Sequence, residues 1–148
     1  MSLTGAEDLL ARARGRIARL TPSEAWQQTS SGRAVLVDIR SGDARVQDGV
    51  VPGSVHIPRT VLEWRLDPAS TWRNPHVAGS TKRIVVLCDH GMSSSLAAAA
   101  LLDLGYADAA DVDGGMEAWH AAGLPVSAVN DRSLASGELP GMGSPSPL

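Results

Sequence analysis

The chain contains a single cysteine, Cys88, and this scarcity excludes a disulfide within one molecule. A lone thiol is typical of reducing compartments, where cysteine stays free for chemistry. The cysteine count therefore favours a cytoplasmic protein whose thiol can react.

Long hydrophobic runs are missing as well. No apolar stretch reaches the roughly 18 residues that a membrane-spanning helix needs. Several charged residues interrupt any signal-peptide core near the N-terminus: Glu7, Asp8, Arg12, Arg14 and Arg16. An excess of positive charge is missing too, since the net charge is −3, so neither nucleic acid nor an anionic membrane is an expected partner. The interpretation is a soluble cytoplasmic protein.

The length of 148 residues predicts one domain with a single hydrophobic core, and no internal repeat is present. Beyond residue 130, Gly, Pro and Ser dominate and no apolar periodicity survives, so a disordered tail is expected. The expected organisation is an N-terminal amphipathic helix within residues 1–20, a folded domain over residues 21–129 and the tail over residues 130–148.

The central feature of the sequence is a buried strand followed by a tight loop and a helix. Residues 84–87 form an unbroken apolar run rich in β-branched side chains, as parallel strands buried on both faces do. Residues 95–104 are strong helix formers, with Ser93 or Ser94 as candidate N-cap. Cys88 lies between them, where unpaired N–H groups and the helix dipole favour a thiolate. This position suits a nucleophile, although a lone cysteine at a strand end is more often a small buried hydrophobe.

Two helices are predicted before the first of the buried strands. Over residues 6–20, apolar residues recur on one helical face with arginines between them, which predicts an amphipathic helix packed against the domain. Thr21 then provides an N-cap, and Glu24 completes a capping box. This second helix is expected to run to about residue 31 and to bury Trp26.

Short strands and helices alternate along the rest of the chain. The expected strands cover residues 34–40, 55–57 and 109–112, and the expected helical segments cover residues 41–48, 61–66 and 115–120. Residues 67–81 are predicted to be an irregular loop punctuated by proline. This alternation predicts an α/β fold, a mostly parallel central sheet with helices on both faces. Sites in such sheets lie at the carboxyl ends of the strands, where Cys88 stands.

Four segments carry short motifs whose order and spacing are specific when taken together. Two lie early in the chain, at residues 35–40 (VLVDIR) and 49–58 (GVVPGSVHIP). Two lie later, at residues 88–94 (CDHGMSS) and 112–126 (VDGGMEAWHAAGLPV). They resemble the opening Asp-x-Arg strand, the Gly-His-Ile-Pro-Gly-Ala-x-Asn-Ile-Pro segment, the Cys-x-x-Gly-x-x-Ser loop and the Gly-Gly-x-x-x-Trp-x-x-x-Gly-x-Pro-Val ending of the single-domain rhodanese-like sulfurtransferases. The resemblance covers residues 20–129 and implies the rhodanese fold.

In that family the loop cysteine attacks the outer sulfur of a donor, becomes a persulfide and passes the sulfur on. The resemblance therefore implies a sulfurtransferase with Cys88 as the catalytic residue and a donor of the thiosulfate or 3-mercaptopyruvate type. The implied acceptor is a thiol or cyanide, with a protein as a further candidate acceptor, and no cofactor or metal is required. The implied active-site loop consists of Asp89, His90, Gly91, Met92, Ser93 and Ser94. Its amides and the two serine hydroxyls are the expected donors to a charged persulfide.

The loop departs from the family pattern in its charge. Many members carry arginine five residues after the cysteine, where this chain has Ser93, although other members have a hydroxyl residue there. Asp89 occupies a position that is often arginine. Arg59 and Arg65 are therefore candidates for binding an anionic substrate, with solvated surface arginines as the alternative.

Other polar residues near the loop have less specific interpretations. Asp38 and Arg40 lie two apart on an extended segment and share a face, which favours a structural ion pair over a catalytic role. His90 either tunes the nucleophile or is an exposed loop histidine. Cys88 and His90 alone fall short of a zinc ligand set, so no metal site is expected.

Two other functions stay open. One is a non-catalytic or regulatory rhodanese-like binding module, the kind that family members become when they lose the cysteine that this chain retains. The other is a phosphatase of the same fold, but such enzymes use Cys-x5-Arg, and the sixth residue after Cys88 is Ser94. Without that arginine a phosphoryl dianion has no bidentate partner.

Overall fold

The computed structural model describes residues 5–129, and the tail expected over residues 130–148 lies outside them. In chain order the elements are α1 (Ala6–Arg16), β1 (Ala18–Leu20), α2 (Pro22–Ser30), β2 (Ala34–Asp38), α3 (Gly42–Asp48), β3 (Val55–His56), the 3₁₀ helix η1 (Arg59–Val61), α4 (Leu62–Leu66), β4 (Arg83–Leu87), α5 (Ser93–Leu104), β5 (Ala110–Val112) and α6 (Gly115–Ala121). None of the described helices has both the length and the apolar character needed to cross a bilayer.

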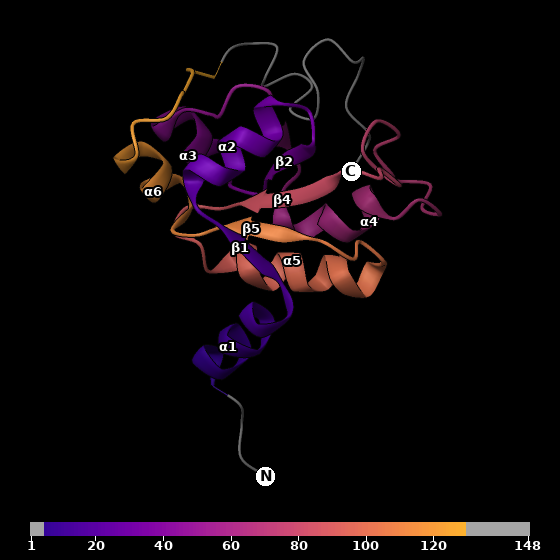
Figure 1. Ribbon diagram of the computed structural model, residues 1–148. Helices are drawn as coiled ribbons and strands as arrows, with labels where there is room; N and C mark the ends of the chain where they lie inside the picture. The colour runs from indigo at the N-terminus through magenta and orange to yellow at the C-terminus, as the bar shows by residue number, and fades with distance from the viewer. Residues whose placement is uncertain (1–4, 130–148) are drawn as a thin grey trace.

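The five strands form one sheet in the order β1-β5-β4-β2-β3, with β4 at its centre (Figure 1). All four strand pairs are parallel. Parallel neighbours need crossover connections, which explains why a helix lies between every two successive strands. The expected α/β fold is confirmed, and the sheet that was expected to be mostly parallel is parallel in every pair of these strands.

The helix expected over residues 6–20 is wrong at its C-terminal end. α1 ends at Arg16, Ile17 takes extended backbone angles (φ −108°, ψ 161°), and the next three residues form the edge strand β1. Ile17 and Leu20 suit a helical stripe as well, but pairing with β5 gives the backbone of β1 hydrogen-bond partners. Tertiary pairing overrides the local periodicity here, and it ties the N-terminal segment into the sheet.

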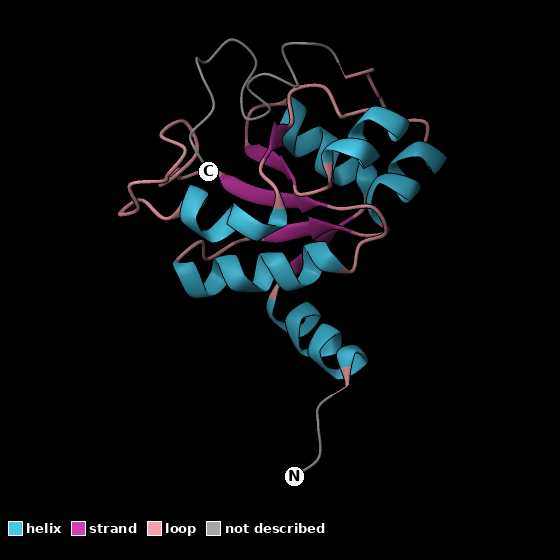
Figure 2. Cartoon of the chain, turned by 180° about the vertical axis from the view of Figure 1, so that it is seen from behind, coloured by secondary structure: helices cyan, strands magenta, loops and turns pink. Residues whose placement is uncertain are grey.

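Hydrophobic clusters fill both faces of the sheet. On one face Val86 and Cys88 pack with Leu101 of α5 and Leu62 of α4, and α1 packs on the outside of α5. On the other face the sheet packs against α2 and α6, with Trp119 fully buried. Figure 2 shows the two helical layers on opposite sides of the strands, with α1 beyond α5 on the side away from the sheet.

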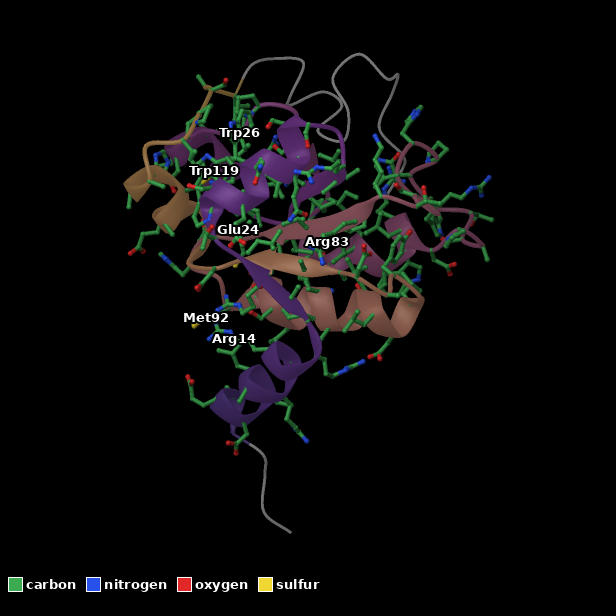
Figure 3. All side chains as sticks on the ribbon, in the orientation of Figure 1. Arg14, Glu24, Trp26, Arg83, Met92 and Trp119 are labelled. Carbon is green, nitrogen blue, oxygen red and sulfur yellow. The ribbon has the colours of Figure 1, made fainter. Side chains whose placement is uncertain are left out.

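Of the two predictions made for α2, its capping box and the burial of Trp26, only the first is confirmed. The capping box is confirmed, because the Glu24 amide donates to Thr21 Oγ1 and the Thr21 amide donates to Glu24 Oε1. The hydrogen bond from the Thr21 backbone lowers the pKa of Glu24. Trp26, expected to be buried, is only half-buried and meets Trp119 edge-on at a centroid distance of 6.0 Å (Figure 3). Trp119 belongs to the buried cluster on this face of the sheet, and Trp26 packs against the outside of that cluster.

Candidate active site

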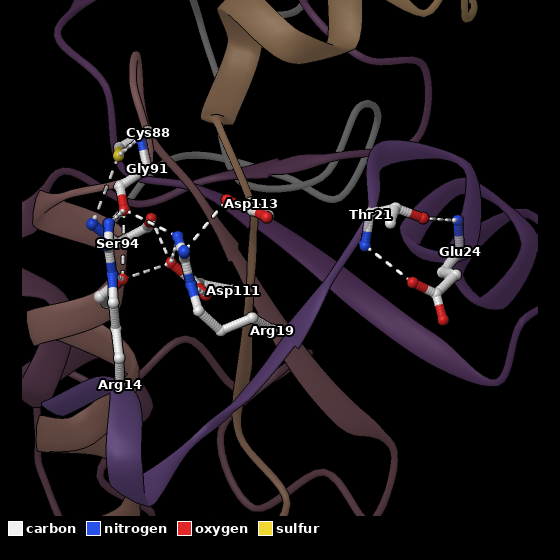
Figure 4. Close-up of polar contacts among 10 residues, drawn as sticks. Arg14, Arg19, Thr21, Glu24, Cys88, Gly91, Ser94, Asp111 and Asp113 are labelled. Atoms are coloured by element: carbon white, nitrogen blue, oxygen red, sulfur yellow. Dashed lines mark hydrogen bonds and ion pairs between the residues drawn. The ribbon is translucent and has the colours of Figure 1, made fainter. Parts of the chain in front are cut away.

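Cys88 follows β4 directly, and its side chain lies among the buried residues of the α5 face, 6% exposed. The sulfur accepts hydrogen bonds from two backbone amides, Gly91 N at 3.1 Å and Ser94 N at 3.3 Å. Figure 4 shows both amides directed at the sulfur. Backbone N–H groups that converge on a thiol stabilise its anionic form and any anion attached to it.

The serines of the loop do not cap the helix as the sequence predicts. α5 begins at Ser93 with Met92 as its N-cap residue, and no side chain caps it. The hydroxyl of Ser94 instead donates to Asp111 Oδ2 at 2.8 Å, so only the amide of Ser94 faces the sulfur. The N-cap expected at Ser93 or Ser94 is therefore wrong: a buried carboxylate on β5 attracts the hydroxyl more strongly than a helix amide does. Ser93 itself is exposed.

The N-terminus of α6 fastens the first half of the loop. Met116 N donates to Cys88 O at 2.8 Å, and Glu117 N donates to Asp89 O at 3.1 Å. This contact requires glycine at position 115, because Gly115 has φ +61° and a Cβ there would lie 2.5 Å from Cys88 O. The Gly-Gly pair before α6 thus lets the two backbones approach closely.

Two arginines from the N-terminal segment hold the second half of the loop. Gly91 O accepts from Arg14 Nη2 at 2.8 Å and from Arg19 Nη2 at 3.0 Å. Arg14 extends from α1 and Arg19 from β1, and their guanidinium groups converge on this carbonyl (Figure 4). Two cationic donors on one carbonyl oxygen make strong, charge-assisted hydrogen bonds.

Asp111 of β5 lies at the centre of this network and is fully buried. It pairs with Arg19 at 3.0 Å and accepts the hydroxyls of Ser94 and Ser95 at 2.8 and 2.7 Å. Burial alone would lower the pKa of Arg19, but the hydrogen bond to Asp111 and the charges of Asp111 and Asp113 outweigh it and raise that pKa. Asp111 thus connects the edge strand to the start of α5.

The opposite side of the loop is acidic. Asp89 and His90 line an open pocket of about 470 Å³ together with side chains of α3 and α6, among them Asp48 and Glu117. His90 is exposed, and its Nδ1 lies 2.8 Å from Glu117 Oε2. This side therefore favours cationic or neutral groups over anions.

Asp38 and Arg40 form a second buried cluster at the carboxyl end of β2. The guanidinium of Arg40 donates to both carboxylate oxygens of Asp38, at 3.0 and 2.9 Å, and to Gly49 O at 2.7 Å. Arg45 of α3 shares the same carboxylate at 3.4 Å. Burial lowers the pKa of Arg45. One buried anion therefore serves two buried cations.

The candidate substrate arginines lie on η1 and α4 and have partners of their own. Arg59 pairs with Glu63 at 2.8 Å on the following turn. Arg65 is 2% exposed, and its Nη1 donates to Trp72 O at 2.6 Å. Burial lowers the pKa of Arg65. An arginine so enclosed offers little surface to a ligand, and substrate binding by either residue stays a prediction.

Sequence reasoning missed Arg14, Arg19 and Asp111 as parts of the site. No local signal marks the arginines, because they lie 72 to 77 residues before Gly91. Asp111 did carry a signal, since an acid inside a buried strand needs a charged or hydrogen-bonding partner. No group of three or more His, Cys, Asp or Glu side chains within residues 5–129 could hold a metal ion.

Fold and site together define an α/β protein with a loop cysteine held by backbone amides at the carboxyl end of the central strand. The chain belongs to the rhodanese-like domain family, whose model matches residues 21–122. The match begins after α1 and β1, so Arg14 and Arg19 lie outside it.

Three solved structures illustrate the likeness. A protein of unknown function from Rhodopseudomonas palustris, described as a possible tyrosine phosphatase, is 33% identical with a TM-score of 0.78, and the match covers 86% of this chain and 99% of that one. The polysulfide-sulfur transferase homodimer from Wolinella succinogenes is 25% identical with a TM-score of 0.64, covering 82% and 86%. The thiosulfate sulfurtransferase from Pseudomonas aeruginosa shares the fold at 22% identity and a TM-score of 0.64, covering 84% of this chain and 23% of that one.

Proposed function

We propose that the protein is a sulfurtransferase that carries sulfane sulfur on Cys88. The observation that carries this proposal is the pair of amides, Gly91 N and Ser94 N, that donate to the Cys88 sulfur. A persulfide is an anion near neutral pH, and backbone N–H groups already directed at the sulfur stabilise it without reorganising. Membership of the rhodanese-like domain family supports the same chemistry.

The reaction consists of two displacements at sulfur. The Cys88 thiolate attacks the outer sulfur of a donor such as thiosulfate, the S–S bond of the donor breaks, and sulfite leaves with the electron pair. An acceptor thiolate or cyanide then attacks the outer sulfur of the persulfide, and the Cys88 thiolate is the leaving group. Each step exchanges one nucleophile for another, so no cofactor is needed.

Intact mass after incubation with thiosulfate or 3-mercaptopyruvate tests the proposal. We expect the wild-type protein to gain one sulfur atom and to lose it with dithiothreitol. Cys88→Ser is the matched control, because the hydroxyl is nearly isosteric with the thiol but is a far weaker nucleophile. We expect it to gain no sulfur, to keep the wild-type circular dichroism spectrum and to retain less than a tenth of the transfer activity. A wild-type protein that never gains sulfur from either donor, or a serine variant that transfers it, contradicts the proposal.

Phosphatase activity is the second candidate, because the Rhodopseudomonas palustris protein is described as a possible tyrosine phosphatase. The loop over residues 88–94 contains no arginine, and Arg14 and Arg19 donate to the Gly91 carbonyl rather than to the sulfur side of the loop. A phosphoryl dianion would therefore bind without a guanidinium fork. Hydrolysis of p-nitrophenyl phosphate that Cys88→Ser abolishes would favour this candidate over sulfur transfer.

A further inference from the structure

The carbonyl of Gly91 is surrounded by donors on the side away from the sulfur. Arg14 Nη2 and Arg19 Nη2 lie 2.8 and 3.0 Å from it, and the hydroxyl of Ser95 lies at 3.1 Å. Ser95 has a single hydroxyl proton, which goes preferentially to the nearer and charged Asp111 Oδ2 at 2.7 Å. The two arginines are therefore the main donors that fix the direction of the Gly91 carbonyl.

The direction of this carbonyl determines where the next amide points. No cis peptide bond is present among the described residues, and in a trans peptide the N–H points opposite to the C=O. Figure 4 shows the Gly91 carbonyl directed away from Cys88 and toward Arg14 and Arg19. The amide of Met92 is therefore turned to the side of the loop on which the sulfur lies. It is positioned to join Gly91 N and Ser94 N as a donor to an anion there.

The two arginines differ in how much of their charge is neutralised. Arg19 pairs with Asp111 and Asp113, both at 3.0 Å. Arg14 donates to neutral oxygens, Gly91 O and the Ser95 hydroxyl, and no ion pair of Arg14 occurs among residues 5–129. Its positive charge therefore acts on the loop without a directly paired anion.

We propose that Arg14 is a positioning residue for Cys88, and this inference rests on the proposed sulfur-transfer function. Its guanidinium holds the Gly91–Met92 peptide with the N–H toward the sulfur, and its charge favours the thiolate and the persulfide. It supplies from α1 a cation that the loop lacks at Ser93 and at Asp89. The N-terminal helix, which lies ahead of the family match at residues 21–122, is thus part of the working site.

The pH dependence of alkylation of Cys88 by iodoacetamide tests the inference without using sulfur transfer. The reagent is uncharged and the chain has one cysteine, so the rate reports the thiolate directly. We expect Arg14→Gln to slow alkylation at pH 7 by about three- to tenfold and to move the midpoint of the rate profile to higher pH, because a nearby positive charge is lost. Arg12→Gln is the matched control, since Arg12 is an exposed arginine of the same helix, and its profile should follow that of the wild type.

A conservative variant separates charge and geometry from a merely structural role. Arg14→Lys keeps the charge but lacks the planar fork that reaches Gly91 and Ser95 together, so its rate should lie between those of the wild type and Arg14→Gln. With thiosulfate, Arg14→Gln should raise KM and lower kcat, while Arg12→Gln should change neither.

The alkylation profiles decide whether Arg14 positions Cys88. A profile of Arg14→Gln that superimposes on the wild type, with a wild-type melting temperature, overturns the inference. If Arg14→Gln does not fold, Arg14→Lys decides, and a wild-type profile for that variant overturns it. If alkylation slows as expected but the wild-type protein never gains sulfur from thiosulfate or 3-mercaptopyruvate, the positioning role stands and the proposed function fails.

Discussion

Two carboxylates flank the central strand β4, one on each neighbouring strand, and each binds arginine. Asp38 ends β2, and Asp111 lies within β5. Asp38 is paired in register with Leu87 and Asp111 with Val86, so the two carboxylates face opposite sides of the sheet. Asp111 shares the α5 side with Cys88, and Asp38 faces the side covered by α2 and α6.

The difference between the two clusters lies in what their arginines contact. Around Asp38 the guanidinium groups of Arg40 and Arg45 are enclosed and bind Asp38 itself and Gly49 O. Around Asp111, Arg19 is 21% exposed and reaches the carbonyl of the cysteine loop. Similar ion pairs therefore have different neighbours: the first holds the end of β2 to α3 and to Gly49, and the second reaches the loop that contains Cys88.

Asp38→Asn should have the largest effect of the substitutions, because it disrupts the enclosed cluster around Asp38. It leaves the buried cations of Arg40 and Arg45 without their shared anion, and removing one partner of a buried pair costs about 3–5 kcal/mol. Urea unfolding measures the loss. Asp113→Asn is the control, because Asp113 is 64% exposed and its pair with Arg19 should contribute less than about 1 kcal/mol. A loss below 1 kcal/mol for Asp38→Asn would show that the cluster is not a stabilising one.

Asp111→Asn should disrupt the cluster around Asp111, with a smaller loss of stability and a larger loss of activity than Asp38→Asn. Arg19 can turn toward solvent, and the amide still accepts from Ser94 or Ser95, so we expect a cost of about 1–3 kcal/mol. The start of α5 loses an anchor beside the sulfur, and kcat/KM for thiosulfate should fall about tenfold or more, because small misplacements at a reacting atom are costly. Asp38→Asn at a temperature where it is folded should retain near-wild-type kcat/KM. Equal activity in the two variants would remove the distinction between the clusters.

Asp89→Arg changes the charge on the acidic side of the loop. Asp89 is half-buried and lines the pocket that also contains Glu117. A carboxylate about 4 Å from a thiolate opposes it by about 1 kcal/mol in water, so its replacement by a cation should raise kcat/KM for thiosulfate several-fold. The gain should shrink at high salt and be smaller for 3-mercaptopyruvate, which carries less charge. No gain at low ionic strength would indicate that the Asp89 side chain does not act on the donor.

The smallest expected effect is a pH dependence that originates in the Asp38 cluster. His56 Nε2 lies 2.8 Å from Arg40 O, and burial, aided by the charge of Arg45, lowers the pKa of His56. The unfolded chain then takes up a proton near the ordinary histidine pKa, about 6.5, before the folded protein does, so stability falls as the pH drops below that value. Melting temperatures between pH 8 and pH 5.5 measure the fall. In His56→Gln this part of the pH dependence should disappear, and an unchanged dependence would assign it to other groups.

Local signals predicted the parts of the molecule that depend on near neighbours. The capping box joins Thr21 and Glu24, which are only three positions apart, and the apolar run before Cys88 is itself sufficient to predict β4. Leu20 fits a helical pattern, but it lies in β1, where the pairing with β5 determines the backbone conformation. The contacts of Arg14 and Arg19 with Gly91 depend on how α1 and β1 pack against α5 and β5, which no local pattern contains.

The loop that contains Cys88 is held through its backbone carbonyl groups, so it can tolerate substitutions of its side chains. Cys88 O and Asp89 O accept hydrogen bonds from the amides of α6, and Gly91 O accepts them from arginines outside the loop. The shape of the loop around the Cys88 sulfur therefore depends on main-chain oxygen atoms. The exposed side chains of His90, Met92 and Ser93 take no part in these bonds. These three residues can therefore be exchanged while the backbone of the loop keeps its shape, so substitutions at a few surface positions can change the size and charge of the groups that reach Cys88.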